Sequence, residues 1–191
     1  MNLPNKITIS RILLMFVFLV VCNIDELFKD DVLRMWCRAV GLLFAIIAGF
    51  TDILDGYLAR KYDQVTDFGK LMDPLADKIF TATTFIMLVD KGLLPGWVAV
   101  VVLSREFMVT GLRLLAARKG EVIPADITGK VKTVIQMVFL AFGGSMWLGW
   151  ISPKDDTVRV VWLVFYLCVV VVTVSSGVSY FVRHRNLYGD A

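Results

Sequence analysis

Four closely spaced aspartates are the part of this sequence whose residue types and spacing indicate chemistry. Asp52 and Asp55 are three residues apart, and Asp73 and Asp77 are four residues apart. On a helix, residues at these separations lie on the same face. If each pair occupies its own helix and the turn between the helices is short, the four carboxylates converge at one end of an antiparallel helix pair.

A divalent cation is what such a group of carboxylates requires. Four like charges repel one another, and carboxylates near hydrocarbon are costly. Ligand sets made only of oxygen suit Mg²⁺ or Mn²⁺ rather than zinc. Two such ions about 4 Å apart can stabilise the attacking and leaving oxygens of a phosphoryl transfer. The pattern therefore predicts a two-metal site on the four aspartates, the alternative being ordinary surface charges at a membrane boundary.

The residues between the aspartates fit a ligand that comes close to the backbone. Gly56 and Gly69 have no side chain, and Ala59 is nearly as small. Arg60 is a permanent cation that can bind phosphate through two nitrogens. Glycine in a membrane helix is otherwise a packing contact, and the position of these glycines among the acids favours the ligand-facing interpretation.

The composition is that of a membrane protein. Of 191 residues, 58% are hydrophobic and 19% are charged, whereas soluble domains have about 45–50% apolar and about 25% charged residues. The net charge of +3 and the lack of a dense Lys/Arg stripe argue against nucleic acid as a partner. A spanning helix needs about 20 mostly apolar residues. Six segments fit this length: Ile7–Asn23, Ala39–Ala59, Leu71–Val89, Leu93–Ala117, Val134–Pro153 and Val160–Val182.

These segments predict an all-α integral membrane protein, a bundle of six transmembrane helices that forms one domain over residues 1–191. No small-x-small cleavage site follows the first segment, so we interpret it as a retained span rather than a signal peptide. Basic residues concentrate in the loops of one side, which places both termini in the cytoplasm and the aspartates at the cytoplasmic membrane boundary. These basic residues are Lys6, Arg11, Arg60, Lys61, Lys70, Arg118, Lys119, Lys130, Lys132, Arg183 and Arg185.

Residues 52–77 resemble the signature of the CDP-alcohol phosphatidyltransferase family, D-x2-D-G-x2-A-R-x8-G-x3-D-x3-D, at all eight fixed positions. The resemblance implies transfer of a phosphatidyl group from CDP-diacylglycerol to a small alcohol, with CMP as the leaving group. It implies that Asp52, Asp55 and Asp73 hold the metals. Asp77 would complete the second metal site and act as the general base.

The resemblance also assigns residues to the nucleotide. Gly56, Ala59 and Gly69 would line the cytidine pocket, and Arg60 would lie near the nucleotide phosphates. The N-terminal segment LPNKITISR is similar to one that is common in the family, so Asn5 and Thr8 are candidates for nucleotide binding. A helix start with a basic interfacial anchor explains the same segment, and both interpretations stay open.

A group of cations in the second half of the chain indicates an anionic acceptor. The candidates for binding its phosphate are Arg105, Arg113, Arg118, Lys130 and Lys132. Because charges at mid-helix cost at least about 2.5–3.5 kcal/mol, structural pairing of Arg105 with Glu106 is an alternative. The last apolar segment is expected to add only hydrophobic length.

The run from Ser104 to Gln136 resembles bacterial phosphatidylglycerophosphate synthases of the same family, which implies sn-glycerol 3-phosphate as the acceptor and the bacterial inner membrane as the location. Cardiolipin synthases have a similar region. Phosphatidylglycerol, serine or an inositol phosphate are therefore alternative acceptors. The resemblance also suggests a homodimer surrounded by membrane lipids. A divalent-cation transporter is the alternative from another class, but its acids should lie near the midplane of the membrane.

Overall fold

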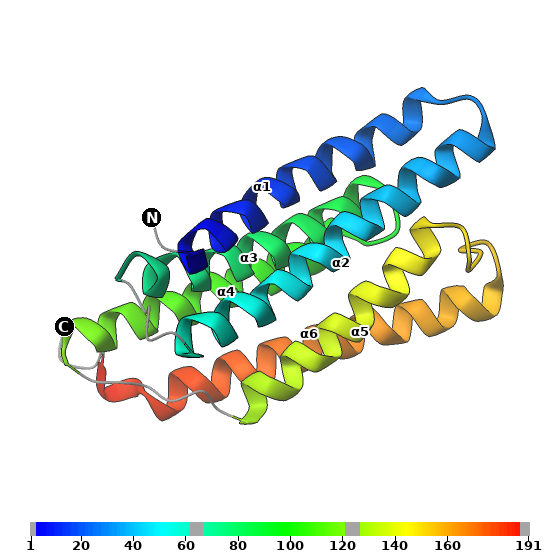
Figure 1. Cartoon of the computed structure of the whole chain (residues 1–191). Helices are drawn as coiled ribbons and strands as arrows, with labels where there is room; N and C mark the ends of the chain where they lie inside the picture. The colour runs from blue at the N-terminus through cyan, green and yellow to red at the C-terminus, as the bar shows by residue number, and fades with distance from the viewer. Residues whose placement is uncertain (1–2, 62–66, 121–126, 188–191) are drawn as a thin grey trace. The chain divides into compact units, whose positions relative to one another are not determined.

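A computed structural model describes residues 3–61, 67–120 and 127–187. Within these ranges, the side chains of residues 3–7, 49–61, 67–71, 73, 127–128 and 130 are not described. The described residues form six α-helices and two short 3-10 helices and contain no strand, which confirms the all-α class (Figure 1). The helices are α1 (Leu3–Ile24), α2 (Asp31–Lys61), α3 (Asp67–Asp90), α4 (Gly96–Arg118), α5 (Ile127–Trp147) and α6 (Asp156–Arg183). The 3-10 helices are η1 (Asp25–Leu27) and η2 (Arg185–Leu187).

The helices form two compact units, residues 1–90 with α1 to α3 and residues 91–191 with α4 to α6. Two stretches of the described chain, Thr8–Leu27 and Asp156–Arg183, are long and apolar enough to cross a membrane. Val131–Trp147 is apolar but shorter. The count of six spans stays a prediction, because only the described residues bear on it and two of their helices meet this criterion.

Two helices differ most from the segments that hydropathy predicts. α2 begins at Asp31 rather than near residue 39, because Asp30 accepts a hydrogen bond from the backbone N–H of Val32 (2.8 Å) and starts the helix in a polar stretch. α5 begins at Ile127 and ends at Trp147, not at residue 153. The chain leaves the helix before Gly149, whose positive φ of 81° is incompatible with a right-handed α-helix.

In the first unit, α1 lies along α2 and also packs against α3 (Figure 1). The buried face of α1 follows a spacing of three and four residues through Thr8, Arg11, Met15, Phe18 and Cys22. These residues must therefore face the two helices that carry the aspartates.

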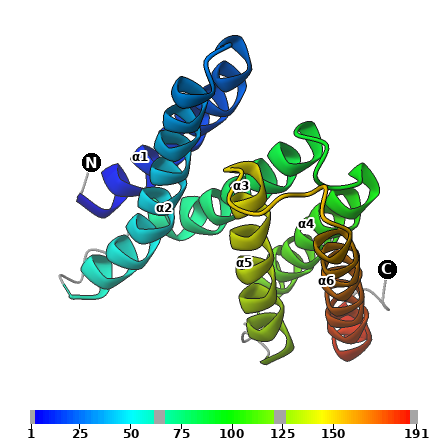
Figure 2. The same cartoon turned by 90° about the vertical axis from the view of Figure 1, so that its right-hand side faces the viewer.

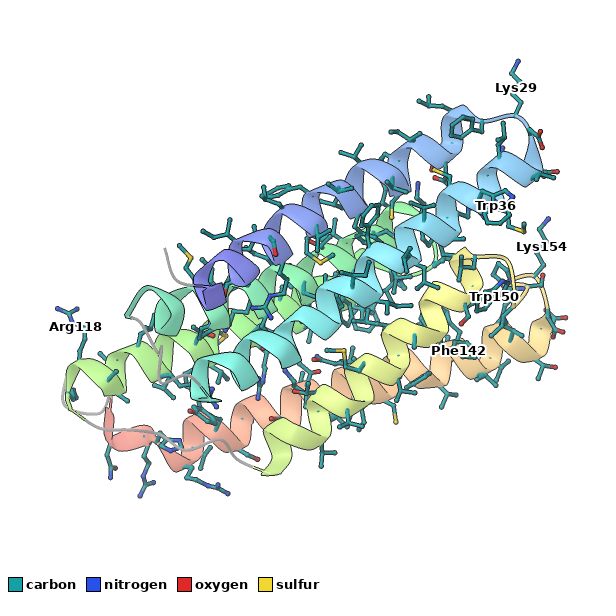
Figure 3. All side chains as sticks on the ribbon, in the orientation of Figure 1. Lys29, Trp36, Arg118, Phe142, Trp150 and Lys154 are labelled. Atoms are coloured by element: carbon teal, nitrogen blue, oxygen red, sulfur yellow. The ribbon has the colours of Figure 1, made fainter. Side chains whose placement is uncertain are left out.

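The turn between α1 and α2 is held by a buried ion pair. Asp25 in η1 is fully buried, and its carboxylate binds Nε of Arg38 on α2 at 2.7 Å. Arg34 donates to the backbone oxygen of Phe28 at 2.9 Å. These contacts join α1 to α2 at the end of the unit where Lys29 lies (Figure 3).

In the second unit, α6 packs against both α4 and α5 (Figure 2). Phe139 of α5 stacks on Trp162 of α6 with ring centroids 4.4 Å apart, and Nε1 of Trp162 donates to the backbone oxygen of Leu93 at 2.6 Å. Within this unit, Arg118 lies at one end and Lys154 at the other (Figure 3).

The start of α6 depends on one capping side chain. Asp155 accepts hydrogen bonds from the backbone N–H groups of Thr157 (2.8 Å) and Val158 (3.4 Å). We expect Asp155→Ala to lower stability by about 0.5–2 kcal/mol, since two helix N–H groups lose their acceptor. Thermal unfolding of the purified protein in detergent measures the loss.

The neighbouring Asp156→Ala is the control for this substitution. Asp156 is exposed and makes a surface ion pair with Arg159 at 3.4 Å, so its loss should be smaller. A melting temperature for Asp155→Ala no lower than that of Asp156→Ala would contradict the capping role.

Candidate functional site

Both aspartate pairs lie on helices, as their spacing predicts. α2 carries Asp52 and Asp55 near its C-terminal end, and α3 carries Asp73 and Asp77 in its first half. The connecting residues 62–66 and the side chains of Asp52, Asp55 and Asp73 lie outside the described part of the structure. The convergence of the four carboxylates therefore stays a prediction, now with helical backbone at each of the four positions.

Asp77 is the one member of this set whose side chain is described. It is exposed, and its carboxylate makes no hydrogen bond or ion pair with another residue of the described set. The hydroxyl of Thr81 donates to the backbone oxygen of Asp77 at 3.2 Å and does not involve its carboxylate. An exposed carboxylate without such a partner can bind a cation or accept a proton. No group of three or more metal-binding side chains occurs among the described residues.

α3 contains a proline directly after Asp73. Pro74 has no N–H, so it cannot donate to the carbonyl of Lys70 as the helix pattern requires. Lys78 donates to the backbone oxygen of Pro74 at 3.1 Å. The hydrogen-bond ladder of α3 therefore lacks the bond from position 74 to the carbonyl of Lys70.

The positions predicted to bind the nucleotide also lie on helices. Gly56, Ala59 and Arg60 belong to α2, and Gly69 belongs to α3. Their side-chain surroundings, and those of Asn5 on α1, lie outside the described set.

Thr8 is the member of the N-terminal segment that the structure does place. It is 1% exposed and lies on the face of α1 that packs on α2 and α3. This side chain is inside the first unit, so it faces the helices of the aspartates rather than solvent.

Arg11, which the sequence predicts to be a loop charge, is a buried cation. It is 1% exposed and lies on the same face as Thr8 and Met15. Its spacing of three from Thr8 and four from Met15 was the available signal, since it continues the buried stripe of the helix. A buried guanidinium needs compensating polar groups, which places Arg11 among the residues of functional interest in this unit.

In the second unit, Glu106 joins two of the predicted phosphate-binding cations. Its Oε1 accepts from Nη1 of Arg105 at 3.3 Å and also from Nζ of Lys132 on α5. The three side chains are largely buried, with exposed fractions of 12% for Arg105, 16% for Glu106 and 7% for Lys132. The pairing of Arg105 with Glu106, which the sequence left open, is present.

Two polar side chains of α6 accept hydrogen bonds from residues of α4 and α5. Ser176 accepts from Nη2 of Arg105 at 2.7 Å, and Thr173 accepts from Gln136 of α5 at 3.4 Å. Gly177 makes room for the stem of Arg105, because a Cβ there would lie 3.1 Å from its Cγ. α6 thus adds polar anchors as well as hydrophobic length, contrary to expectation.

The other predicted cations differ in their surroundings. Arg113 is exposed, and its Nε donates to the hydroxyl of Tyr180 on α6 at 3.0 Å. Arg118 is exposed at the end of α4 (Figure 3). Lys130 lies on α5, with its side chain outside the described set. Within the second unit, the described contacts thus bring Arg105 and Lys132 together on Glu106, whereas Arg113 is held separately by Tyr180.

Three buried polar residues of α6 were not among the residues predicted from the sequence. Thr173, Ser176 and Tyr180 follow one another at spacings of three and four, which places them on one helix face. This spacing was the available signal, because buried polar groups require partners on neighbouring helices.

Known proteins resemble this chain over most of its length. A sequence model described as CDP-alcohol phosphatidyltransferase matches residues 1–174, which include both compact units in large part. A CDP-diacylglycerol--glycerol-3-phosphate 3-phosphatidyltransferase of Bacillus subtilis is 45% identical over 141 residues, 72% of this chain and 73% of that protein.

Two further relatives extend over almost the whole chain. A protein of the same name from Rickettsia felis is 36% identical over 182 residues, 94% of this chain and 93% of its own length. A probable phosphatidylglycerophosphate synthase of Mycobacterium tuberculosis is 36% identical over 182 residues, 95% of this chain and 81% of its own length.

Proposed function

The chain belongs to the CDP-alcohol phosphatidyltransferase family, and we infer from this membership that it transfers the phosphatidyl group of CDP-diacylglycerol to sn-glycerol 3-phosphate. The products are phosphatidylglycerophosphate and CMP, so the protein is a transferase of phospholipid biosynthesis. The observation that carries this conclusion is the similarity to relatives named for this reaction over 94% of the chain.

The aspartates of α2 and α3 are proposed as the reaction centre. Asp52, Asp55, Asp73 and Asp77 would hold Mg²⁺ or Mn²⁺, which when bound would offset the charge of the diphosphate and of the departing phosphate. Their oxygen-only chemistry fits these ions, and the exposed carboxylate of Asp77 is open to a ligand.

The packing of α2 supports the convergence of its two aspartates on the bundle side. Gly41 and Ala48 lie on the buried face of α2. In a continuous helix, the positions four and seven residues after Ala48 continue that face, and these are positions 52 and 55.

Asp77 is proposed as the general base. Its carboxylate would accept the proton of the acceptor hydroxyl, whose oxygen then attacks the phosphorus next to diacylglycerol while the bond to CMP breaks. Gly56, Ala59 and Gly69 would admit the cytidine, and Arg60 would bind the nucleotide phosphates. Asn5 and Thr8 are proposed to contact the nucleotide, supported by the packing of α1 against the helices that carry the aspartates.

The cations of the second unit are proposed to bind the acceptor phosphate. Arg113 and Arg118 are exposed and can reach a ligand directly. Arg105 and Lys132 both bind the carboxylate of Glu106, so the three side chains together keep a formal positive charge that can attract a phosphate. Lys130 completes this proposed set.

We propose that all six helices span the inner membrane of a bacterium, with both termini in the cytoplasm, and that the protein is a homodimer. Apolar side chains exposed along α4 and α6, such as Val100, Val171 and Val178, support a hydrocarbon environment. The basic ends of α4 at Arg118 and of α6 at Arg183 support the orientation, because positive charge marks the cytoplasmic side.

Acceptor assays test the proposed function. We expect the purified protein, with CDP-diacylglycerol and Mg²⁺ or Mn²⁺, to release CMP and to convert radiolabelled glycerol 3-phosphate into lipid. Reactions without CDP-diacylglycerol are the control. Serine, an inositol phosphate and phosphatidylglycerol are compared in parallel, and turnover with one of them but none with glycerol 3-phosphate would refute the acceptor. Metal flux into vesicles without CMP release would favour the transporter alternative.

A further inference from the structure

Arg113 on α4 is held at one end and accessible at the other. Its Nε donates to the hydroxyl of Tyr180 at 3.0 Å, and its Cζ lies 5.7 Å from the centre of the Tyr180 ring. Arg113 itself is exposed. A guanidinium has five N–H donors, and the contact with Tyr180 uses the one on Nε. The two terminal nitrogens form the fork that matches two oxygens of a phosphate.

Tyr180 is itself rigidly placed. It is 5% exposed and packs with Val109, Leu112 and Ala116, all on α4. Its ring also lies against the ring of His184, with centroids 4.7 Å apart. Because this core sets the position of the ring, the hydroxyl is presented to Arg113 from a fixed point.

We propose that Tyr180 is a positioning residue for the acceptor: its hydroxyl orients Arg113 so that the guanidinium fork meets the phosphate of the acceptor alcohol. The inference rests on the proposed function, in which Arg113 binds that phosphate. An arginine on an exposed helix face has many rotamers, and fixing one before binding reduces the entropy lost when the phosphate is bound. Tyr180 therefore acts on acceptor affinity and takes no part in the proton transfer at Asp77.

Tyr180→Phe removes only the hydroxyl and keeps the ring in its core. The hydrogen bond joins a charged donor to a neutral acceptor, so its loss should raise the KM for glycerol 3-phosphate about tenfold. The kcat and the KM for CDP-diacylglycerol should change less than about twofold, because the ring still packs and the metal site lies on other helices. Steady-state CMP release measures all three constants.

Tyr166→Phe is the matched control, since Tyr166 lies on the same helix and packs edge-on against Trp97 with ring centroids 6.2 Å apart. It should leave the KM for glycerol 3-phosphate unchanged.

In an Arg113→Lys background, Tyr180→Phe should raise the KM for glycerol 3-phosphate little further, because the guanidinium that Tyr180 orients is gone. Two results would overturn the proposal. One is a KM for glycerol 3-phosphate in Tyr180→Phe that equals the wild-type value. The other is a decrease in kcat and an increase in both KM values by similar factors, together with a lower melting temperature. The absence of wild-type turnover with glycerol 3-phosphate would instead refute the proposed function.

Discussion

Asp77→Asn is expected to abolish measurable CMP release, with kcat lowered by about 10²–10⁴-fold. Asparagine keeps the size of the side chain and one oxygen, but it cannot accept the proton of the acceptor hydroxyl. Because the carboxylate of Asp77 is exposed and has no partner among the described side chains, the substitution should leave the fold intact. CMP release by the purified variant measures the loss, and Mn²⁺ binding by calorimetry should be retained at least in part.

Asp31→Asn provides the control for this experiment. It makes the same chemical change on a carboxylate that is 94% exposed, in the first turn of α2. Its contact with Arg34 at 3.5 Å is a surface ion pair of small energy, so CMP release should stay at the wild-type level. Normal CMP release by Asp77→Asn would refute the base assignment. Complete loss of metal binding would instead indicate that the main role of Asp77 is to bind the metal.

Asp55→Asn should lower CMP release by about 10³-fold or more, because a lost metal ligand removes several kcal/mol of stabilisation of the transferring phosphoryl group. Arg60→Gln should cost less, about 10- to 100-fold, since it removes charged hydrogen bonds to the nucleotide phosphates and leaves the metal ligands unchanged. Rates measured over a range of Mn²⁺ concentrations distinguish the two. Higher Mn²⁺ should partly restore Asp55→Asn and should not restore Arg60→Gln.

A chelator serves as the reference for these two variants, because it should stop wild-type CMP release until Mn²⁺ is added back. An Arg60→Gln loss as large as that of Asp55→Asn would contradict the division of roles within the signature. An unchanged metal dependence in Asp55→Asn would remove this residue from the metal site.

The helices could be predicted from the sequence because their signals are local. Hydrophobic runs and the spacing of residues such as Asp52 and Asp55 depend on neighbours within two turns. The ends of α2 and α5 were predicted less well. Hydropathy is averaged over a window, whereas a helix starts at a single capping side chain such as Asp30 and stops near a single glycine such as Gly149.

The sequence by itself therefore determined the helical class, the helix positions of the aspartates and the family signature. Only the tertiary structure decided the partners of the cations on α4. Arg113 meets Tyr180 across 67 residues of chain, and Arg105 meets Ser176 across 71. Such contacts depend on which faces of α4 and α6 pack together, and no local spacing contains that information. For the same reason, Arg11 looked like a loop charge until the packing of α1 showed it buried.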